Sequence, residues 1–377
     1  MLETTIEIQN SAQETIRDLL GRLMASGAVD ALLLPVAQPG GAVTPTLVSN
    51  PAALERAEPL APVLPINAAR AVSQLTMTGH RGKLGVVLRA CEIRALVELV
   101  KFQQAKLDDV LVVGIDCLGT YPVPAYQAVE DKAGLLDQLL AGAVAGEVGP
   151  AKGLALRSAC QICELPLPQG EHVALTVGLL GVEAGKLYLK ARDDVAQALA
   201  LAADGVPARR AEAAKALLAA RTQARDEVFA AFRARVGGQG DMQGLLAEFS
   251  TCIRCHNCMT NCPICYCREC IFRTPTFEHE SELYYQWAER KGEVRLLPDT
   301  LLFHLTRLNH MVSSCVGCGV CSDVCPVDIE VMVAFRATGE KVQALFDYHP
   351  GRSLAEEAPV QTFREDELTA MGERPHA

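Results

Sequence analysis

The stretch LGVVLRACEIRALVELVKFQQAKLDDVLVVGID, residues 84–116, predicts the fold of the N-terminal part of the chain. It opens with a short apolar run typical of a buried strand (84–88), continues with apolar residues at helical spacing (91–106) and closes with a second apolar run (110–116). This order predicts a βαβ unit with parallel strands and a right-handed crossover. Residues 89–94 and 116–122 then follow the carboxyl ends of the strands, where α/β folds bind ligands.

Further strands and helices are predicted on both sides of this unit. The predicted strands are AVDALLLPV (28–36), VALTVGLLG (173–181) and GKLYLKA (185–191). The second half of residues 2–27 has helical spacing, and another helix is expected after Asn67, which is a good N-cap residue. AQPGGAVTPT (37–46) is predicted to be a loop. We therefore expect an α/β domain over residues 1–192.

The chain changes in composition after residue 192. It becomes rich in Ala, Arg and Glu, and its mixed charges without an aromatic stripe favour a solvated two-helix connector over a binding role. GGQGD (237–241) is expected to break the helix, and cysteine becomes frequent just beyond it. We expect a helical connector over residues 193–244, a second domain over 245–345 and a C-terminal tail over 346–377.

Length and charge exclude several classes of protein. The chain has 377 residues, half of them apolar, which is enough for two or three domains with cores. Its 45 acidic and 35 basic residues give a net charge of −10, which argues against nucleic-acid binding. No apolar run reaches about 18 residues, so no membrane span is expected. Since the N-terminus also lacks a signal-peptide pattern, we expect a cytoplasmic protein with reduced thiols.

Eight of the fifteen cysteines form two copies of one pattern. Each copy has the spacing C-x2-C-x2-C-x3-C and is followed by proline, at Pro263 and Pro326. This is the pattern of bacterial two-cluster ferredoxins, in which the fourth cysteine of each run binds the other cluster. The sequence therefore predicts an α+β ferredoxin domain of the bacterial type with two 4Fe-4S clusters. One is assigned to Cys252, Cys255, Cys258 and Cys325, the other to Cys315, Cys318, Cys321 and Cys262.

The alternative to this interpretation is a pair of zinc sites, because four-cysteine zinc sites also contain C-x2-C pairs. Zinc ribbons use two separated C-x2-C pairs, however, whereas each run here has three x2-spaced cysteines closed by Cys-Pro. Gly317 and Gly319 also allow the backbone to approach a cluster closely. These features favour iron–sulfur clusters.

Seven further cysteines lie outside the two runs. Cys265, Cys267 and Cys270 are either further cluster ligands or buried thiols in a crowded turn, and the sequence leaves both readings open. The other four are predicted to bind a third 4Fe-4S cluster, because two of them follow neighbouring strand ends and two form a C-x2-C pair. The alternative for these four is that they are small buried apolar residues. They are Cys91, Cys117, Cys160 and Cys163.

Three parts of the sequence resemble a known family. RACEIRALVELVKFQQAKLDDVLVVGIDCLGTYP (89–122) and SACQICELPLP (158–168) look like the beta subunit family of coenzyme F-420-reducing hydrogenases and dehydrogenases. The stretch from FHLTRLNHMVSSCVGCGVC through HPGR (303–352), followed by PVQTFREDEL (359–368), is similar to the ferredoxin-like end of formate dehydrogenase beta subunits. The resemblance covers most of the chain, and its motifs are specific.

The resemblance implies an oxidoreductase subunit that contains FAD and acts as part of a complex. In such subunits the clusters deliver electrons to the flavin, and the flavin passes hydride to a deazaflavin. It also implies a catalytic formate dehydrogenase subunit, dependent on molybdenum or tungsten, on another chain. Nicotinamide as acceptor, and hydrogenase or heterodisulfide-reductase subunits as partners, remain open from the sequence.

The flavin site is harder to locate, because no G-x-G-x-x-G fingerprint is present. GHRGK (79–83) offers two glycines for close approach and two cations for phosphate. Its alternative interpretation is a basic surface turn before a strand. The candidate cofactor-binding residues are Asn67, Gly79, Arg81, Gly82, Lys83 and Arg94.

These features together predict an electron-transfer flavoprotein subunit. Clusters move single electrons and hydride acceptors take two, so a flavin is needed to join the two kinds of step. The rival prediction is a flavin-free subunit that connects a dehydrogenase to a bifurcating or heterodisulfide-reducing complex. The presence or absence of bound flavin separates the two predictions.

Overall fold

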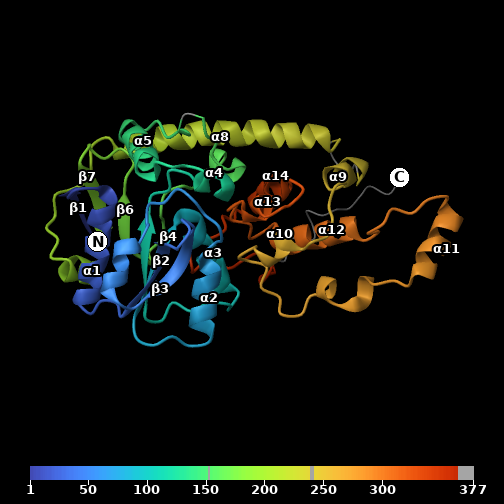
Figure 1. Cartoon of the computed structure of the whole chain (residues 1–377), viewed down its shortest axis with the longest axis horizontal. Helices are drawn as coiled ribbons and strands as arrows, with labels where there is room; N and C mark the ends of the chain where they lie inside the picture. Colours follow the sequence, from blue (N-terminus) through green and yellow to red (C-terminus); the bar gives the residue numbers. More distant parts are fainter. Residues whose placement is uncertain (152, 238–241, 364–377) are drawn as a thin grey trace.

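The computed structural model describes residues 1–151, 153–237 and 242–363, and its N-terminal part is built on one seven-stranded sheet (Figure 1). The strand order is β1-β7-β6-β5-β4-β2-β3. The strands are β1 (Leu2–Glu7), β2 (Ala31–Ala37), β3 (Val43–Val48), β4 (Leu84–Arg89), β5 (Val110–Ile115), β6 (Val173–Gly178) and β7 (Lys186–Ala191).

The centre of the sheet is parallel and its edges are antiparallel. Strands β2, β4, β5 and β6 run in the same direction, whereas β3, β7 and β1 are paired antiparallel to their neighbours. The predicted βαβ unit is confirmed, because Leu84 of β4 pairs in parallel with Val110 of β5. Every residue of β4 is buried, as expected for a strand covered on both faces.

Strand β3 corrects the prediction of a loop over residues 37–46. Its Pro45 pairs with Pro35 of β2, and β3 is the last strand of the sheet. Proline is tolerated in an edge strand because its missing N–H costs no ladder hydrogen bond on the open side. The prolines and glycines of this stretch therefore led to the prediction of a loop where β3 begins.

Helices cover both faces of this sheet. Leu32 and Leu34 pack in the same core as Ile16 of α1, whereas Leu33, which points to the opposite face, packs with Leu96 of α3. The expected helix after Asn67 is present as α2, and the Asn67 side chain accepts a hydrogen bond from the Ala69 N–H. The helices of this part are α1 (Ala12–Ala25), α2 (Ala69–Met77), α3 (Ala90–Lys101), α4 (Val123–Gln127), α5 (Lys132–Ala145), α6 (Ser158–Gln161) and α7 (Asp193–Ala198), with the short 3-10 helix η1 (Pro51–Arg56).

A single long helix joins the two parts of the molecule. Helix α8 (Arg210–Arg235) runs along the top of the view in Figure 1, from α5 towards the C-terminal part. Its 26 residues correspond to about 39 Å. Leu217 is buried against the sheet core, and Phe229 and Phe232 are buried in the core of the C-terminal part. The segment holds two helices, α7 and α8, and α8 is exposed on one face as its charges predicted, but its other face packs on both cores. The predicted break at 237–241 lies, beyond Gly237, outside the described residues.

The C-terminal part is made of helices and loops. Between residues 242 and 363 the structure has no strand. The prediction of an α+β domain is therefore wrong in its β component. None of the described helices is long and apolar enough to cross a membrane. The helices of this part are α9 (Met242–Glu248), α10 (Asn257–Thr260), η2 (Ile271–Arg273), η3 (Pro275–Phe277), α11 (Ser281–Lys291), α12 (Thr300–Met311), α13 (Val320–Asp323) and α14 (Val331–Leu345).

The two parts are held together by buried polar contacts. Glu98 of α3 is fully buried and accepts hydrogen bonds from the Tyr348 hydroxyl at 2.6 Å and from the Gly351 N–H at 2.8 Å. Arg94, also on α3, donates to the Val316 carbonyl at 2.5 Å. Such bonds to a buried charge stabilise by about 1.5–3 kcal/mol each. The α/β domain and the cysteine-rich part are therefore tightly docked.

Candidate iron–sulfur and flavin sites

The two cysteine runs fold into loops with the same backbone conformation. In the first run Arg254 and His256 have φ of 53° and 61°, and in the second run Gly317 and Gly319 have φ of 68° and 74°. These residues stand at equivalent places between the cysteines. Each loop then enters a four-residue helix, α10 or α13, that begins just after its second left-handed residue. The repeat in sequence is therefore a repeat in structure.

The structure brings together the first predicted ligand set, including the cysteine from the other run. Burial raises the pKa of Cys258, Arg307 lowers it, and the nearby thiols of Cys252, Cys255 and Cys325 raise it. The same neighbours, Cys325 and Cys255, raise the pKa of Cys252 after burial. Cys325 thus lies beside the three x2-spaced cysteines of the first run, as the ferredoxin pattern requires.

The second ligand set converges in the same crosswise manner. Burial raises the pKa of Cys262 to about 12, with Arg307 opposing and Cys318 and Cys315 adding to the rise. Cys321 also has a raised pKa, through burial and then through Cys318, Cys262 and Cys315. Cys262 therefore lies with the second run although it belongs to the first. Among the described residues, no three His, Cys, Asp or Glu side chains are spaced to hold a single metal ion.

Two side chains of α12 contact the sulfurs of the first set. The Arg307 guanidinium donates to the Cys258 sulfur at 3.1 Å and to its carbonyl at 3.0 Å. The His304 Nε2 atom lies 3.3 Å from the Cys252 sulfur, and its ring stacks on Phe249. Burial lowers the pKa of His304 to about 3, with Arg307 adding to the decrease, so its imidazole is neutral. Neither residue can be recognised from the sequence, because nothing in their helical spacing separates them from core positions.

Two buried donors near these sulfurs have no protein partner. Among the described residues, the Arg307 Nε and Arg157 Nε atoms are buried and make no hydrogen bond. Arg307 is 4% exposed, and its pKa is raised by Cys258, Cys262, Cys321 and Cys265 against the effect of burial. Unpaired buried donors are costly, so such groups point to an acceptor that the protein itself does not supply. The sulfides of an anionic cluster are acceptors of that kind.

The four remaining N-terminal cysteines line one chamber at the carboxyl edge of the sheet. Cys91 lies in the first turn of α3, Cys117 follows β5, Cys160 lies in α6 and Cys163 comes just after it. Burial raises the pKa of Cys117 to about 11, with Cys160 adding to the rise, Arg89 lowering it and Cys163 raising it further. Burial also raises the pKa of Cys91, and Glu92, Cys117, Cys318 and Cys163 add to the rise. The predicted convergence of these cysteines is thus present in the structure.

Three buried arginines line the same chamber. Arg89, Arg157 and Arg221 are 8%, 3% and 5% exposed. Arg157 donates to the Thr120 hydroxyl at 3.1 Å, and that hydroxyl lies 3.2 Å from the Cys160 sulfur. Arg157 pairs with Asp323 and Arg89 with Glu92, and a cluster with four thiolate ligands would add further negative charge beside these buried cations. The charges around this chamber therefore fit a 4Fe-4S cluster.

The chamber adjoins the second ligand set. Cys318 and Gly317 line it together with the four cysteines, and the Arg157 guanidinium donates to the Cys318 carbonyl at 2.9 Å. A Cβ atom on Gly319 would lie 2.2 Å from the Cβ of Ala159 in α6. The second cysteine run therefore packs directly on the α/β domain.

The six residues predicted to bind the cofactor do not lie together. Gly79, Arg81, Gly82 and Lys83 precede β4 and lie at its amino end, whereas Cys91 follows its carboxyl end. The Lys83 N–H donates to Asp30 at 2.7 Å, and a Cβ atom on Gly82 would lie 2.2 Å from the same carboxylate. Asn67 and Arg94, in contrast, reach the second cysteine run.

Asn67 is buried beside the second ligand set. Burial raises the pKa of Cys318, and Asn67 is among the groups that lower it. Arg94 binds the Val316 carbonyl, as described above. Both residues therefore face the cluster loop, and any role in flavin binding stays a prediction.

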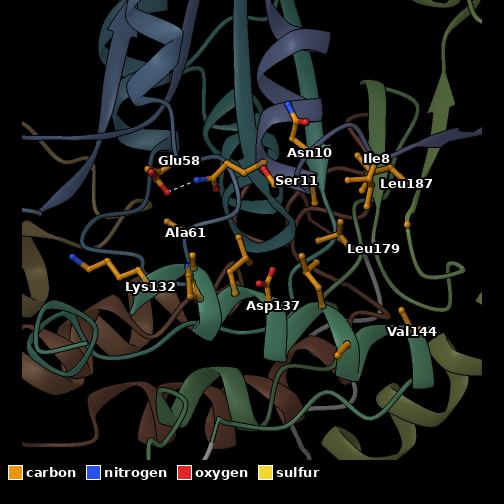
Figure 2. Close-up of a pocket in the computed structure, with 18 of the residues that line it drawn as sticks. Ile8, Asn10, Ser11, Glu58, Ala61, Lys132, Asp137, Val144, Leu179 and Leu187 are labelled. Atoms are coloured by element: carbon orange, nitrogen blue, oxygen red, sulfur yellow. Dashed lines mark hydrogen bonds between the residues drawn. The ribbon is translucent and has the colours of Figure 1, made fainter. Parts of the chain in front are cut away.

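A larger cavity lies further along the carboxyl edge of the sheet (Figure 2). It has a volume of about 600 Å³ and is bounded by the beginning of α1, by α5 and by the ends of β1, β6 and β7. Leu136, Leu140 and Leu179 give it an apolar wall. Lys132 and the N-terminal residues of α1, including Ser11, give it a polar end. Its lining comes from segments far apart in the sequence, so no local motif indicated it.

This cavity has the features of a site for a large phosphate-containing ligand. Two 14-residue helices, α1 and α5, begin at its border, capped by the Ser11 hydroxyl and the Asp131 carboxylate, and helix N-termini attract phosphate through the N–H groups that such caps leave free. Gly41 has φ of 83°, and a Cβ atom there would lie 3.3 Å from the Lys132 Nζ atom, so glycine leaves this corner open. Ligand pockets commonly have volumes of about 300–1,000 Å³ with apolar walls and a few polar groups. The lining also includes three carboxylates, those of Glu58, Asp137 and Glu183, and the amine of Lys186.

Comparisons with known proteins concern the cysteine-rich part and the chain as a whole. Residues 248–329 match the family model of the 4Fe-4S dicluster domain. The F420-dependent formate dehydrogenase subunit beta of Methanocaldococcus jannaschii is 28% identical over 300 residues, which span 71% of this chain and 74% of that protein. The resemblance to the coenzyme F-420 hydrogenase and dehydrogenase beta subunit family is confirmed. The C-terminal part is accordingly a ferredoxin-like 4Fe-4S dicluster domain, and it follows an α/β domain.

Two further proteins are similar to this chain. The F420-dependent formate dehydrogenase 1 subunit beta of Methanococcus maripaludis is 26% identical over 310 residues, which span 74% of this chain and 74% of that protein. A chain of the F420-reducing [NiFe] hydrogenase complex from Methanosarcina barkeri superposes with a TM-score of 0.40 and 13% sequence identity. That superposition covers 61% of this chain and 91% of the hydrogenase chain.

Proposed function

We propose that this chain is the electron-transfer subunit of a formate dehydrogenase complex that reduces coenzyme F-420. It holds the two clusters of the ferredoxin-like domain, a third 4Fe-4S cluster on Cys91, Cys117, Cys160 and Cys163, and FAD in the cavity of Figure 2. A separate molybdenum or tungsten subunit oxidises formate. The observation that carries the proposal is the continuity of the three cysteine sets, which lead from the C-terminal part to the carboxyl edge of the sheet.

One short segment of the chain borders both the third cysteine set and the cavity. Ala61 and Pro62 line the cavity, and Leu64 lines the cysteine chamber, so one four-residue segment borders both. The Arg89 guanidinium donates to the Ala61 carbonyl, and the Tyr121 N–H donates to the Pro62 carbonyl at 2.8 Å. These bonds fix the segment between the two sites. Electrons would cross a rigid wall of protein between adjacent cofactors.

The residues of the cavity have separate roles in this proposal. FAD, when bound, supplies the interconversion between one-electron and two-electron transfer. Lys132 at one side of the cavity and the first N–H groups of α1 at another would each offer positive charge to its diphosphate. The leucines of α5 would pack against its ring system and exclude water. The Gln13 amide donates a hydrogen bond of 2.5 Å to the Glu58 carboxylate and so holds that carboxylate in place.

The experiment compares one chemical change at two places. Lys132→Gln alters the cavity, and Lys83→Gln alters the turn that the sequence favoured. Both proteins are reconstituted with iron and sulfide without oxygen, and FAD binding is titrated by flavin fluorescence. We expect Lys132→Gln to weaken FAD binding about tenfold, which corresponds to about 1.4 kcal/mol, and Lys83→Gln to leave it unchanged.

Other outcomes overturn particular parts of the proposal. If wild-type protein binds no flavin, the flavin-free connecting subunit is the correct description. If Lys83→Gln abolishes binding and Lys132→Gln does not, the flavin lies at the amino edge of the sheet. The complex with its catalytic subunit should reduce coenzyme F-420 with formate; reduction of a nicotinamide instead would replace the proposed acceptor. Formate oxidation by this chain alone would contradict the proposal as a whole.

A further inference from the structure

Three cysteines of the first run's continuation are not used by any site described so far. Cys265, Cys267 and Cys270 follow the fourth cysteine of the run with the spacing C-x-C-x2-C. In the structure all three line one cavity. The sequence left their role open, and this convergence favours a common ligand.

The cavity is large compared with a single ion. Its volume is about 120 Å³, whereas a cavity of about 10–15 Å³ by a comparable measure already holds one water molecule. Buried Met259, Phe272 and Met311 form its apolar wall, and the Met259 sulfur lies 3.9 Å from the Cys270 sulfur. A group of several atoms with soft ligands suits this space better than one metal ion.

The charges around the cavity favour an anionic occupant. Arg307 and Arg273 are in its lining, opposed by the single carboxylate of Glu269. Arg307 is buried, and its Nε atom has no partner among the described residues. The cavity also contains one imidazole, that of His310 in the last turn of α12. Imidazole nitrogen, like thiolate, is an established ligand of iron in clusters.

We propose that Cys265, Cys267 and Cys270 hold a fourth 4Fe-4S cluster, with His310 as its remaining ligand. Cys265 is three residues beyond Cys262, and its N–H donates to the Cys262 carbonyl at 3.3 Å. The fourth cluster is therefore the direct neighbour of the second, and one electron passes between them at a time. Exposed Cys267 places it at the surface, as a side branch of the path towards the flavin.

The test counts iron and acid-labile sulfide in the full chain after anaerobic reconstitution. Four clusters correspond to about sixteen iron and sixteen sulfide per chain. Replacing both Cys267 and Cys270 by serine should remove about four of each, a quarter of the total. Arg268→Gln, which changes an exposed residue between the same cysteines but outside the cavity lining, is the matched control, with an unchanged count expected. His310→Cys should keep all the iron, whereas His310→Ala should lose or convert this cluster alone.

The proposal has clear ways to fail. Unchanged iron and sulfide in the double serine variant would overturn it, as would the loss of one zinc in place of four iron. If the double variant loses all clusters because it does not fold, the His310 pair decides. An EPR spectrum and iron count of His310→Ala identical to those of wild type would then overturn the fourth cluster.

Discussion

The two cysteine runs share one backbone but use different residues to build it. In the second run the left-handed positions are glycine, whereas the first run places Arg254 and His256 there. Left-handed backbone costs a non-glycine residue about 1–2 kcal/mol. The first run offsets this cost with side-chain contacts: Arg254 pairs with buried Asp299, and His256 stacks on Phe303 at 4.8 Å.

The difference reflects what each loop faces. The second loop lies against the α/β domain, where a Cβ atom on Gly319 would overlap Ala159, and against α14, where one on Gly317 would lie 3.0 Å from Arg336. The first loop contacts the α/β domain at Thr260, whose carbonyl accepts a hydrogen bond from Arg70 of α2, but its Cys255 is exposed. The second loop is thus the junction of the molecule, because its cluster adjoins the third set of cysteines and the first loop. Equal spacing of cysteines predicts equal geometry, but not equal surroundings.

The largest effect is expected for Gly319→Ala. The new Cβ would combine a left-handed backbone with a contact of 2.2 Å to Ala159, so we expect a loss of about 2–4 kcal/mol in the free energy of unfolding. The second cluster should become labile as the loop shifts. Denaturant unfolding and the iron content after gel filtration measure these two effects.

His256→Ala is the matched substitution in the first loop. It keeps a non-glycine residue at a left-handed position and removes only the stacking on Phe303, which is worth about 1 kcal/mol. Iron content should stay at the wild-type value. Equal destabilisation by the two alanine variants would show that the second loop is not more constrained than the first.

The second effect separates the clusters by their place in the molecule. Cys255→Ser and Cys318→Ser should each remove about four iron atoms per chain, because each cysteine serves one cluster. Cys318 also lines the chamber beside α3 and α6, so its variant should in addition loosen the contact between the two parts. Limited proteolysis would detect this, with faster cleavage for Cys318→Ser alone. Identical cleavage rates would remove the distinction between an inner and an outer loop.

Much of the cluster geometry could be predicted from the sequence. The crosswise ligation follows from the two C-x2-C-x2-C-x3-C runs, and the structure brings Cys325 and Cys262 to the opposite runs. The convergence of Cys91 with Cys117 follows from the βαβ unit, since both come after carboxyl ends of neighbouring parallel strands. Both predictions rest on short-range spacing or on strand direction, which the sequence records directly.

The cofactor cavity could not be predicted in this way. Its lining is drawn from both ends of the α/β domain and depends on how β1 and β7 are added to the sheet. Strand direction nevertheless held one unused signal: Gly79–Lys83 precede β4, so a parallel sheet places them opposite to Cys91. The glycines and cations of residues 79–83 suggested a phosphate site, but this prediction did not take the direction of β4 into account. Buried Arg157 and Arg307 left no signal, because an arginine side chain normally faces solvent.

The smallest effect concerns the reduction potentials of the two ferredoxin-type clusters. Reduction adds negative charge, which the Arg307 guanidinium stabilises through its hydrogen bond to the Cys258 sulfur. Arg307→Gln should therefore lower the potential of the first cluster by about 40–60 mV, equivalent to about 1 kcal/mol for one electron. The second cluster has no such bond from Arg307, so its potential should shift less.

Arg336→Gln is the control, because Arg336 lies against the second loop but donates to Gln343 and Glu164. EPR-monitored redox titration should show an unchanged first potential in that variant. Equal shifts of both clusters in Arg307→Gln would mean that Arg307 acts only through its charge, and that the hydrogen bond does not distinguish the first loop from the second.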